Sequence, residues 1–273
     1  MEELKNEFTT DYDVDDSDDE NWILKAQGQE VTIPAGEKEE IKTATLQGKE
    51  FGFGGNLWKL NNSNAYEEIT EVIRSNTKPN NDIIVDAHLW STSDSEYPVY
   101  FWLDNNKLYY WTEATHIYLN KDASYMFQMW KKLTNLNFIK EFDESKTENM
   151  SYMFQFCLAV TDFSPIKDWN VSNVNNMTAM FGQTKMTSID LSKWNTYNVK
   201  NMGGMFHNCS NLTTIYASTN FDTSNVTDSG GGMFTDCTAL VGGNNTNYDS
   251  TKIDKTMAHI DGGTSNPGYF TAK

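Results

Sequence analysis

The sequence predicts an α/β solenoid: a stack of about five coils sharing one parallel sheet, preceded by a small mixed α+β region and a capping hairpin. Two markers recurring at one period predict this fold. The dipeptide Met-Phe begins at Met126, Met153, Met180, Met205 and Met233, in steps of 27, 27, 25 and 28 residues. An aromatic residue followed by Asp or Asn occurs at Phe142, Trp169, Trp194 and Phe221, in steps of 27, 25 and 27 residues. Independent markers with one spacing indicate repeated units that bury their apolar faces by stacking.

Composition is compatible with a large folded core and argues against two classes of partner. Of the 273 residues, 38% are hydrophobic, and there are 8 Trp, 13 Tyr and 15 Phe. The net charge is −17, and ten acidic residues against one Lys lie between Met1 and Trp22. Nucleic acids and anionic membranes carry negative charge themselves, so this surface disfavours both.

Residues 1–22 are predicted to form a disordered acidic tail, because they carry much charge and little apolar surface. The segment DYDVDDSDDENW from Asp11 resembles the start of an EF-hand calcium loop. However, Asp16 stands where that loop needs Gly, and Trp22 stands where it needs a bidentate Glu, so no calcium site is predicted. No apolar run reaches the ~20 residues of a membrane span, and the N-terminus lacks a signal-peptide pattern. We expect no span, signal or anchor within this chain.

Residues 23–118 are predicted to form an α+β region that ends in a hairpin. The VTI run at Val31 and the FGFGG segment at Phe51 indicate short strands. Asn64, with Glu67 three residues later, is typical of the start of a helix, which is predicted to run to Arg74. Residues 83–89 are predicted to form a further strand.

The segment PVYFWLDNNKLYYWTE from Pro98 predicts a β-hairpin whose turn is Asn105-Asn106. In that register Trp102 opposes Tyr109 and Leu103 opposes Leu108. Both faces of the hairpin carry apolar residues. We therefore expect both faces to be covered, with the hairpin sealing the first coil of the stack.

Residues 119–273 are predicted to hold the coils and a C-terminal cap. An LxxLxL-like stretch after each Met-Phe favours a short strand with one buried face, which makes the coils leucine-rich-repeat-like. The apolar positions are Leu133, Leu136 and Phe138; Val160 and Phe163; Met186, Ile189 and Leu191; and Leu212, Ile215 and Ala217. Asn149, Asn176, Asn201 and Asp228 each precede a Met-Phe segment as a helix N-cap would. Met150, Met153 and Phe154 then have the spacing of one buried helical turn.

The cysteines and histidines give no evidence of a metal site or a catalytic site. Cys157, Cys209 and Cys237 occupy one column of the repeats, which favours small buried residues; a Cys209–Cys237 disulfide is the alternative. The four histidines lack metal-ligand spacing, so no metal or cofactor is predicted. No catalytic motif is present, and the protein is not expected to be an enzyme. An Asp162/Asp190 carboxylate pair of the glycosidase type is the remaining enzymatic alternative to a solvated ladder.

The units NVSNVNNMTAMF, NVKNMGGMFHNCSNLTTI and FDTSNVTDSGGGMFTDCTAL resemble the BspA-type leucine-rich repeats of bacterial surface proteins. The likeness covers residues 97–273. It departs at Ser229, where the pattern has Met, and in the third unit, which is about two residues short. The resemblance implies a secreted or surface-anchored protein, adhesion to host matrix proteins or to other bacteria, and no catalysis.

The exposed positions of the predicted strands form a polar stripe, for which binding of an extracellular protein or glycan is predicted. Its candidate binding residues are Asn135, Asn137, Asp162, Asp190, Thr214 and Tyr216, with Ser164 and Ser188 between them. Tyr216 is the expected anchor, because it is the aromatic residue in this set. The alternative is an inert spacer that displays another domain. We expect a monomer.

Overall fold

The computed structural model describes residues 13–15, 21–26, 29–34, 41–49, 51, 57, 65–85, 88–227 and 232–273. It divides into two compact units, residues 1–41 and 42–273. The described residues are mostly strand and turn, with small parallel sheets and a large buried aromatic core. The hairpin and the repeats fall in one unit, and the domain boundaries at 22 and 118 stay predictions.

The first unit contains an antiparallel sheet of β1 (Asp13–Asp15), β2 (Asn21–Ala26) and β3 (Gln29–Pro34), in the order β1-β2-β3. The VTI run lies in β3, as predicted. Strand β1 and the first two residues of β2 lie within the stretch predicted to be disordered. The rest of that stretch lies outside the described residues.

The second unit begins with β4 (Thr43–Thr45), the short helix α3 (Ala65–Glu68) and β5 (Glu71–Arg74). The predicted helix is present as α3 but ends at Glu68, so its extension to Arg74 is wrong. Residues 71–74 instead pair in parallel with β7 (Lys107–Thr112), because the β-branched pair Val72-Ile73 suits a strand once a partner is present. The predicted strand over residues 83–89 is also wrong: residues 81–85 are turns and bends, and among the described residues of this stretch only Leu89 forms a bridge, to Tyr100. Asn64 lies outside the described residues.

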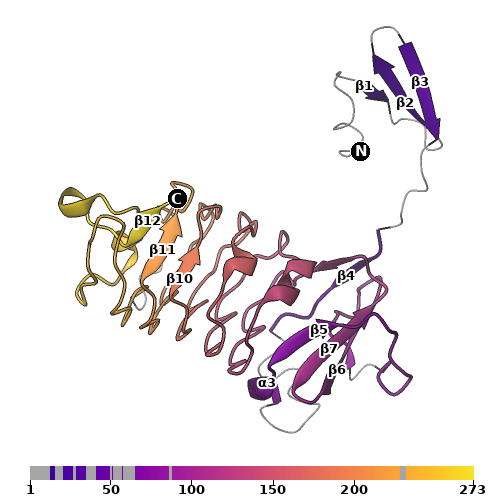
Figure 1. The fold of residues 1–273 in the computed structure, drawn as a ribbon, viewed down its shortest axis with the longest axis horizontal. Helices are drawn as coiled ribbons and strands as arrows, with labels where there is room; N and C mark the ends of the chain where they lie inside the picture. The colour runs from indigo at the N-terminus through magenta and orange to yellow at the C-terminus, as the bar shows by residue number, and fades with distance from the viewer. Residues whose placement is uncertain are drawn as a thin grey trace. The chain divides into compact units, whose positions relative to one another are not determined.

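The predicted hairpin register is confirmed. Strand β6 (Val99–Asp104) pairs with β7, and Trp102 faces Tyr109 while Leu103 faces Leu108. Asn105 and Asn106 have φ values of 48° and 62°, the left-handed conformation that a two-residue type I′ turn requires. The prediction that both faces are covered is wrong. Figure 1 shows the β5-β7-β6 sheet at one end of the second unit, with the repeats following in a row.

Two parallel sheets replace the predicted single one. The first has the order β4-β8-β9, with β8 (His116–Tyr118) and β9 (Phe142–Asp143). The second has the order β10-β11-β12, with β10 (Ser188–Asp190), β11 (Thr214–Ala217) and β12 (Phe270–Ala272). In the first two repeats the expected strands give way to the 3-10 helices η2 (Asn137–Glu141) and η3 (Ser164–Ile166).

Side chains just before these 3-10 helices explain the loss of the strands. The Asn135 Oδ1 atom accepts a hydrogen bond from the Asn137 amide at 3.1 Å, and the Asp162 Oδ1 atom accepts one from the Ser164 amide at 2.8 Å. Such Asx turns fold the backbone away from an extended strand. Pro165 in η3 also lacks the N–H that a ladder needs. In the two later repeats the equivalent residues are Ser188 and Thr214, which lie in strands.

Consecutive repeats lie against each other at the predicted period. Parallel bridges link Asp122, Asn149, Asn176 and Asn201 in sequence. The amides of Phe127, Phe154, Phe181 and Phe206 donate to the carbonyls of Met153, Met180, Met205 and Met233, at 2.9–3.0 Å. Each repeat therefore satisfies backbone groups of its neighbour.

The predicted helical turn after each Asn is wrong. The Met153 amide does bond to the Met150 carbonyl, but the Tyr152 amide donates to Thr178 of the next repeat instead of an earlier residue of its own. Tyr152 has φ 59°, and the left-handed conformation recurs at the equivalent Tyr125, Ala179 and Gly204. The N-cap residues act as Asx-turn acceptors: the Asn149 and Asn176 Oδ1 atoms each accept an amide two residues on, at 3.0 Å. Asp228 lies outside the described residues.

The core is a row of stacked rings. Phe127, Phe154, Phe181, Phe206 and Phe234 are fully buried, as predicted for the three in the middle. Their centroids are 5.7–6.0 Å apart and successive rings lie within 14° of parallel. The four apolar positions Leu136, Phe163, Ile189 and Ile215 are also buried, at 3% exposure or less.

The three cysteines are free and buried, so the alternative of a Cys209–Cys237 disulfide is wrong. Each thiol donates to the carbonyl of a Phe in the preceding repeats: Cys157 to Phe127, Cys209 to Phe181 and Cys237 to Phe206, at 3.0–3.2 Å. Burial raises the pKa of Cys157 to about 12. These thiols are structural donors along the row of repeats.

Candidate functional site

The β10-β11-β12 sheet brings together four residues of the predicted stripe. Ser188 pairs with Thr214, and Asp190 pairs with Tyr216, which itself pairs with Thr271 of β12. All five side chains lie on the side of the sheet away from the buried Ile189 and Ile215, and none of them is buried. We call Ser188, Asp190, Thr214, Tyr216 and Thr271 the polar face.

Lys273 completes the polar face, and sequence reasoning missed it. Its Nζ atom lies 2.5 Å from Asp190 Oδ2 and 5.0 Å from the centre of the Tyr216 ring. Its amide donates to the Ala217 carbonyl, which fixes the backbone beside β11. Lys273 follows the last repeat, so the alignment of equivalent repeat positions gave no reason to select it.

Asp190 is held as a carboxylate. Burial on its own raises the pKa of Asp190, but the hydrogen bonds from Lys273 and from the Ser192 amide and hydroxyl outweigh it, and the pKa is lowered. The Lys273 ammonium also lies over the electron-rich Tyr216 face, a favourable cation–π arrangement. The three side chains therefore form one preorganised charged and aromatic group, with Lys273 half-exposed.

The other candidate residues do not extend this sheet. Asp162 and Ser164 are exposed and hydrogen-bond to each other in the turn at η3. Asn135 lies in the turn before η2, and Asn137 is the first residue of η2. The carboxylates of Asp162 and Asp190 each accept hydrogen bonds from the amide and hydroxyl of the serine two residues further on.

A second surface was missed because the hairpin was expected to be covered on both faces. Val99, Phe101, Leu108 and Tyr110 point into the core, whereas Tyr100, Trp102, Tyr109 and Trp111 on the opposite face are partly exposed. We call these four residues the outer aromatic face. The available signal was the two runs of three aromatic residues, at 100–102 and 109–111, because successive side chains of a strand point to opposite faces and such a run places aromatics on both.

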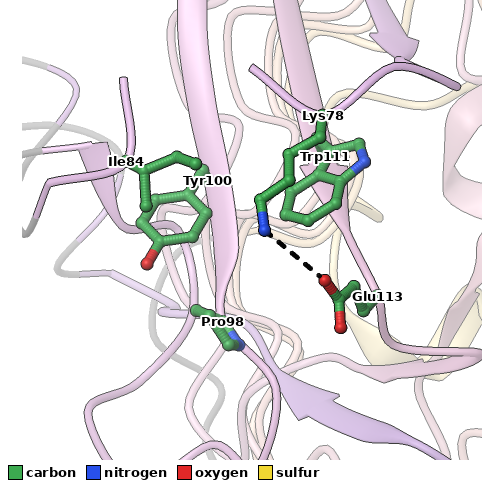
Figure 2. Close-up of a pocket in the computed structure, with 6 residues that line it drawn as sticks. All are labelled: Lys78, Ile84, Pro98, Tyr100, Trp111 and Glu113. Carbon is green, nitrogen blue, oxygen red and sulfur yellow. Dashed lines mark ion pairs between the residues drawn. The ribbon is translucent and has the colours of Figure 1, made fainter. Parts of the chain in front are cut away.

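A small pocket of about 150 Å³ lies at one end of the outer aromatic face. It is lined by Lys78, Ile84, Pro98, Tyr100, Trp111 and Glu113. Figure 2 shows Tyr100 and Ile84 on one side and Trp111 with Lys78 on the other. Lys78 Nζ lies 3.7 Å from Glu113 Oε1 and 5.2 Å from the Trp111 ring centre.

Within the part of the chain that the structure describes, no three His, Cys, Asp or Glu side chains gather as a metal site. His116 pairs instead with Asp143, at 2.7 Å between Nε2 and Oδ2. The described helices are all too short or too polar to cross a membrane.

Comparison with known proteins identifies one part of the chain. The model of a family described as "Mycoplasma protein of unknown function, DUF285" matches residues 121–248. No curated protein and no solved structure matches the chain. The matched residues include all five Met-Phe dipeptides and the backbone ladder between them. The segment from residue 121 to residue 248 is therefore a DUF285 domain.

Proposed function

We propose that this chain is a cell-surface or secreted binding protein that recognises an extracellular macromolecule through the polar face of the β10-β11-β12 sheet. The supporting observation is the group formed by Asp190, Tyr216 and Lys273. An aromatic ring that is held in place, yet only partly covered, contributes contact area at little further loss of side-chain entropy. The charged pair beside it supplies directional hydrogen bonds.

The finer architecture is part of the proposal. The repeats build a leucine-rich-repeat-type solenoid of about five coils, of the BspA type, that carries this face. The unbroken inter-repeat hydrogen bonds and the stacked phenylalanines support it. Stacked units of this kind provide extended surfaces on which small polar side chains recur, a common basis for protein and glycan recognition.

Location at the cell surface, the absence of catalysis and a monomeric state belong to the same proposal. The resemblance of the repeat motifs to bacterial surface proteins supports the location. The hydrogen bonds that Asp162 and Asp190 accept from neighbouring serine hydroxyl groups support binding over hydrolysis, because each carboxylate is engaged within its own turn.

The test is a binding screen of the full chain against immobilised extracellular matrix proteins and glycans, followed by variants. Tyr216→Ala and Asp190→Ala should each weaken a hit by at least about tenfold, a change of about 1.4 kcal/mol. Tyr197→Ala is the matched control, because Tyr197 is 58% exposed and lies off the polar face. It should leave binding unchanged.

Three outcomes contradict the proposal. Binding that survives both polar-face substitutions moves the site elsewhere. The absence of any ligand across the screen favours a spacer that displays another domain, and measurable glycosidase turnover would remove the claim that the chain only binds.

A further inference from the structure

The outer aromatic face is unusual for the solvent side of a sheet. Cross-strand pairing places Tyr100 beside Trp111 and Trp102 beside Tyr109. The Trp102 and Tyr109 rings stack at 5.6 Å and 13°. One side of an antiparallel sheet normally presents polar residues to water. Four adjacent aromatic rings that remain partly exposed instead indicate a surface that meets a ligand.

The pocket beside Tyr100 and Trp111 restricts the size of that ligand. Its volume of about 150 Å³ matches a cavity that accommodates a single six-membered ring. Most of its lining is apolar, from Ile84, Pro98 and the two rings, and a few polar atoms stand at one side. Small-molecule sites combine apolar walls with a small number of placed polar groups in this way.

The polar groups restrict the charge of the ligand. Lys78 already places its ammonium over Trp111, so a cationic ligand would meet a like charge at the position it needs. Glu113 beside it, together with a net charge of −17, disfavours an anion such as a nucleotide or an acidic sugar. The pocket therefore fits a neutral ligand.

A pyranose ring, the six-membered ring of a neutral hexose, meets these requirements of size, charge and polarity. Its C–H face is weakly positive and apolar, and it complements the negative face of an aromatic ring. Its hydroxyl groups both donate and accept hydrogen bonds; the Glu113 carboxylate can accept from one, and the Lys78 ammonium can donate to another. Tyr100 and Trp102 lie two residues apart on β6, about 7 Å along the strand, so rings continue beyond the pocket.

We propose that the outer aromatic face binds a neutral glycan, with one hexose unit in the pocket between Tyr100 and Trp111 and the next units across Trp102 and Tyr109. This site is separate from the polar face on β10-β11-β12, and its ligand class does not depend on what that face recognises. Each proposal can fail without the other.

The test uses the full chain and defined hexasaccharides. Neutral cello-, laminari-, malto- and chito-hexaose are compared with acidic hexagalacturonate and with cationic chitosan hexamer, by calorimetry and tryptophan fluorescence. At least one neutral series should bind, with affinity increasing from monomer to hexamer. The charged oligosaccharides should bind at least about tenfold more weakly, because each meets a like charge at the pocket.

Variants then locate the site. Trp111→Ala should weaken binding by at least about tenfold. Ile84→Trp, which fills the pocket without removing a hairpin residue, should have a similar effect and keeps the test valid if Trp111→Ala does not fold. Tyr197→Ala, off both faces, should leave glycan affinity unchanged.

The proposal is overturned if no neutral oligosaccharide binds at millimolar concentration. It is equally overturned if binding survives both Trp111→Ala and Ile84→Trp in folded protein, or if an acidic or cationic oligosaccharide binds best. Capture of a matrix protein by this face, without any sugar, would assign it to a protein partner instead.

Discussion

Phe181 illustrates how single side chains hold the repeats together. Its ring stacks between Phe154 and Phe206, at 6.0 and 5.7 Å, and meets the edge of Phe163 at 5.3 Å. The residue is fully buried. Because rings contact both of its faces, its removal leaves a cavity that neither neighbouring repeat can close without breaking the inter-repeat hydrogen bonds.

We therefore expect Phe181→Ala to lower the free energy of unfolding by about 3–5 kcal/mol. Denaturant unfolding followed by tryptophan fluorescence measures it. Leu158→Ala is the control, since Leu158 is 37% exposed and its loss should change stability by less than about 0.5 kcal/mol. A loss below about 1 kcal/mol at Phe181 would mean that the inward face of the repeats relaxes freely.

At the C-terminal end, the buried side chain of Asp261 holds neighbouring backbone segments together through hydrogen bonds. It is 2% exposed, and its carboxylate accepts hydrogen bonds from the Thr246 hydroxyl and from the amides of Asn244, Thr246 and Gly263. Burial alone raises the pKa of Asp261, but these hydrogen bonds outweigh it and hold the pKa well below its usual range. The charged form is the one that the fold stabilises.

The sign of the pH dependence follows. A carboxyl with a lowered pKa in the folded state contributes its stability above the unfolded pKa of about 3.9, and that contribution is lost as the pH falls below this value. We expect Asp261→Asn to lower the melting temperature by several degrees at pH 7, with the difference from the parent protein shrinking towards pH 2. Asp222→Asn is a comparison, because Asp222 is closer to the surface and its carboxylate accepts hydrogen bonds from Ser224. An Asp261 effect equal at both pH values would exclude the carboxylate as its source.

At the scale of elements, the β6-β7 hairpin depends on its turn. Asn105 and Asn106 both have positive φ, a conformation that costs most residues about 1 kcal/mol or more and Gly nothing. Asn106→Gly should therefore be neutral or stabilise the protein by up to about 1 kcal/mol, whereas Asn106→Val should destabilise it by about 1–2 kcal/mol. Thermal denaturation of the two variants provides a matched comparison. Equal melting temperatures would show that the turn does not limit hairpin stability.

The repeats show how one side chain decides between strand and turn. Asn135, Asp162, Ser188 and Thr214 occupy equivalent positions, but the first two close Asx turns and the last two lie in strands. The repeat period alone therefore predicted four equivalent strands. The side chains at this position separate the four repeats, because Asn135 and Asp162 close turns whereas Ser188 and Thr214 do not. Residues 71–74 likewise form a strand because they pair with β7. The pair Glu71–Lys107 joins residues that are 36 positions apart in the chain.

At the scale of the whole molecule, the ends of the chain should contribute unequally to stability. Residues 1–41 form a compact unit of their own. Deleting them should change the melting temperature of residues 42–273 by no more than about 2 °C, because contacts within the second unit do not depend on them. Calorimetry of the shortened chain measures this, and a loss of several degrees would mean that the first unit stabilises the second.

Deleting residues 253–273 should have the opposite effect. The Phe234 amide donates to Ile253, and the Phe234 ring packs against Tyr269 at 5.2 Å. Without this segment the last ring of the row and an unpaired β11 edge are exposed, so the protein should aggregate or lose at least about 5 °C in melting temperature. A shortened chain that stays monomeric with an unchanged melting temperature contradicts a capping role.

The sequence by itself determined the period of the repeats, their buried columns and the register of the hairpin. These features depend on local periodicity and turn chemistry, which neighbouring residues carry. Only the tertiary structure decided which repeats form strands, that Lys273 reaches Asp190 across 83 residues, and which face of the hairpin stays open. Those outcomes depend on contacts between distant segments, because a side chain becomes buried or exposed only through what packs against it.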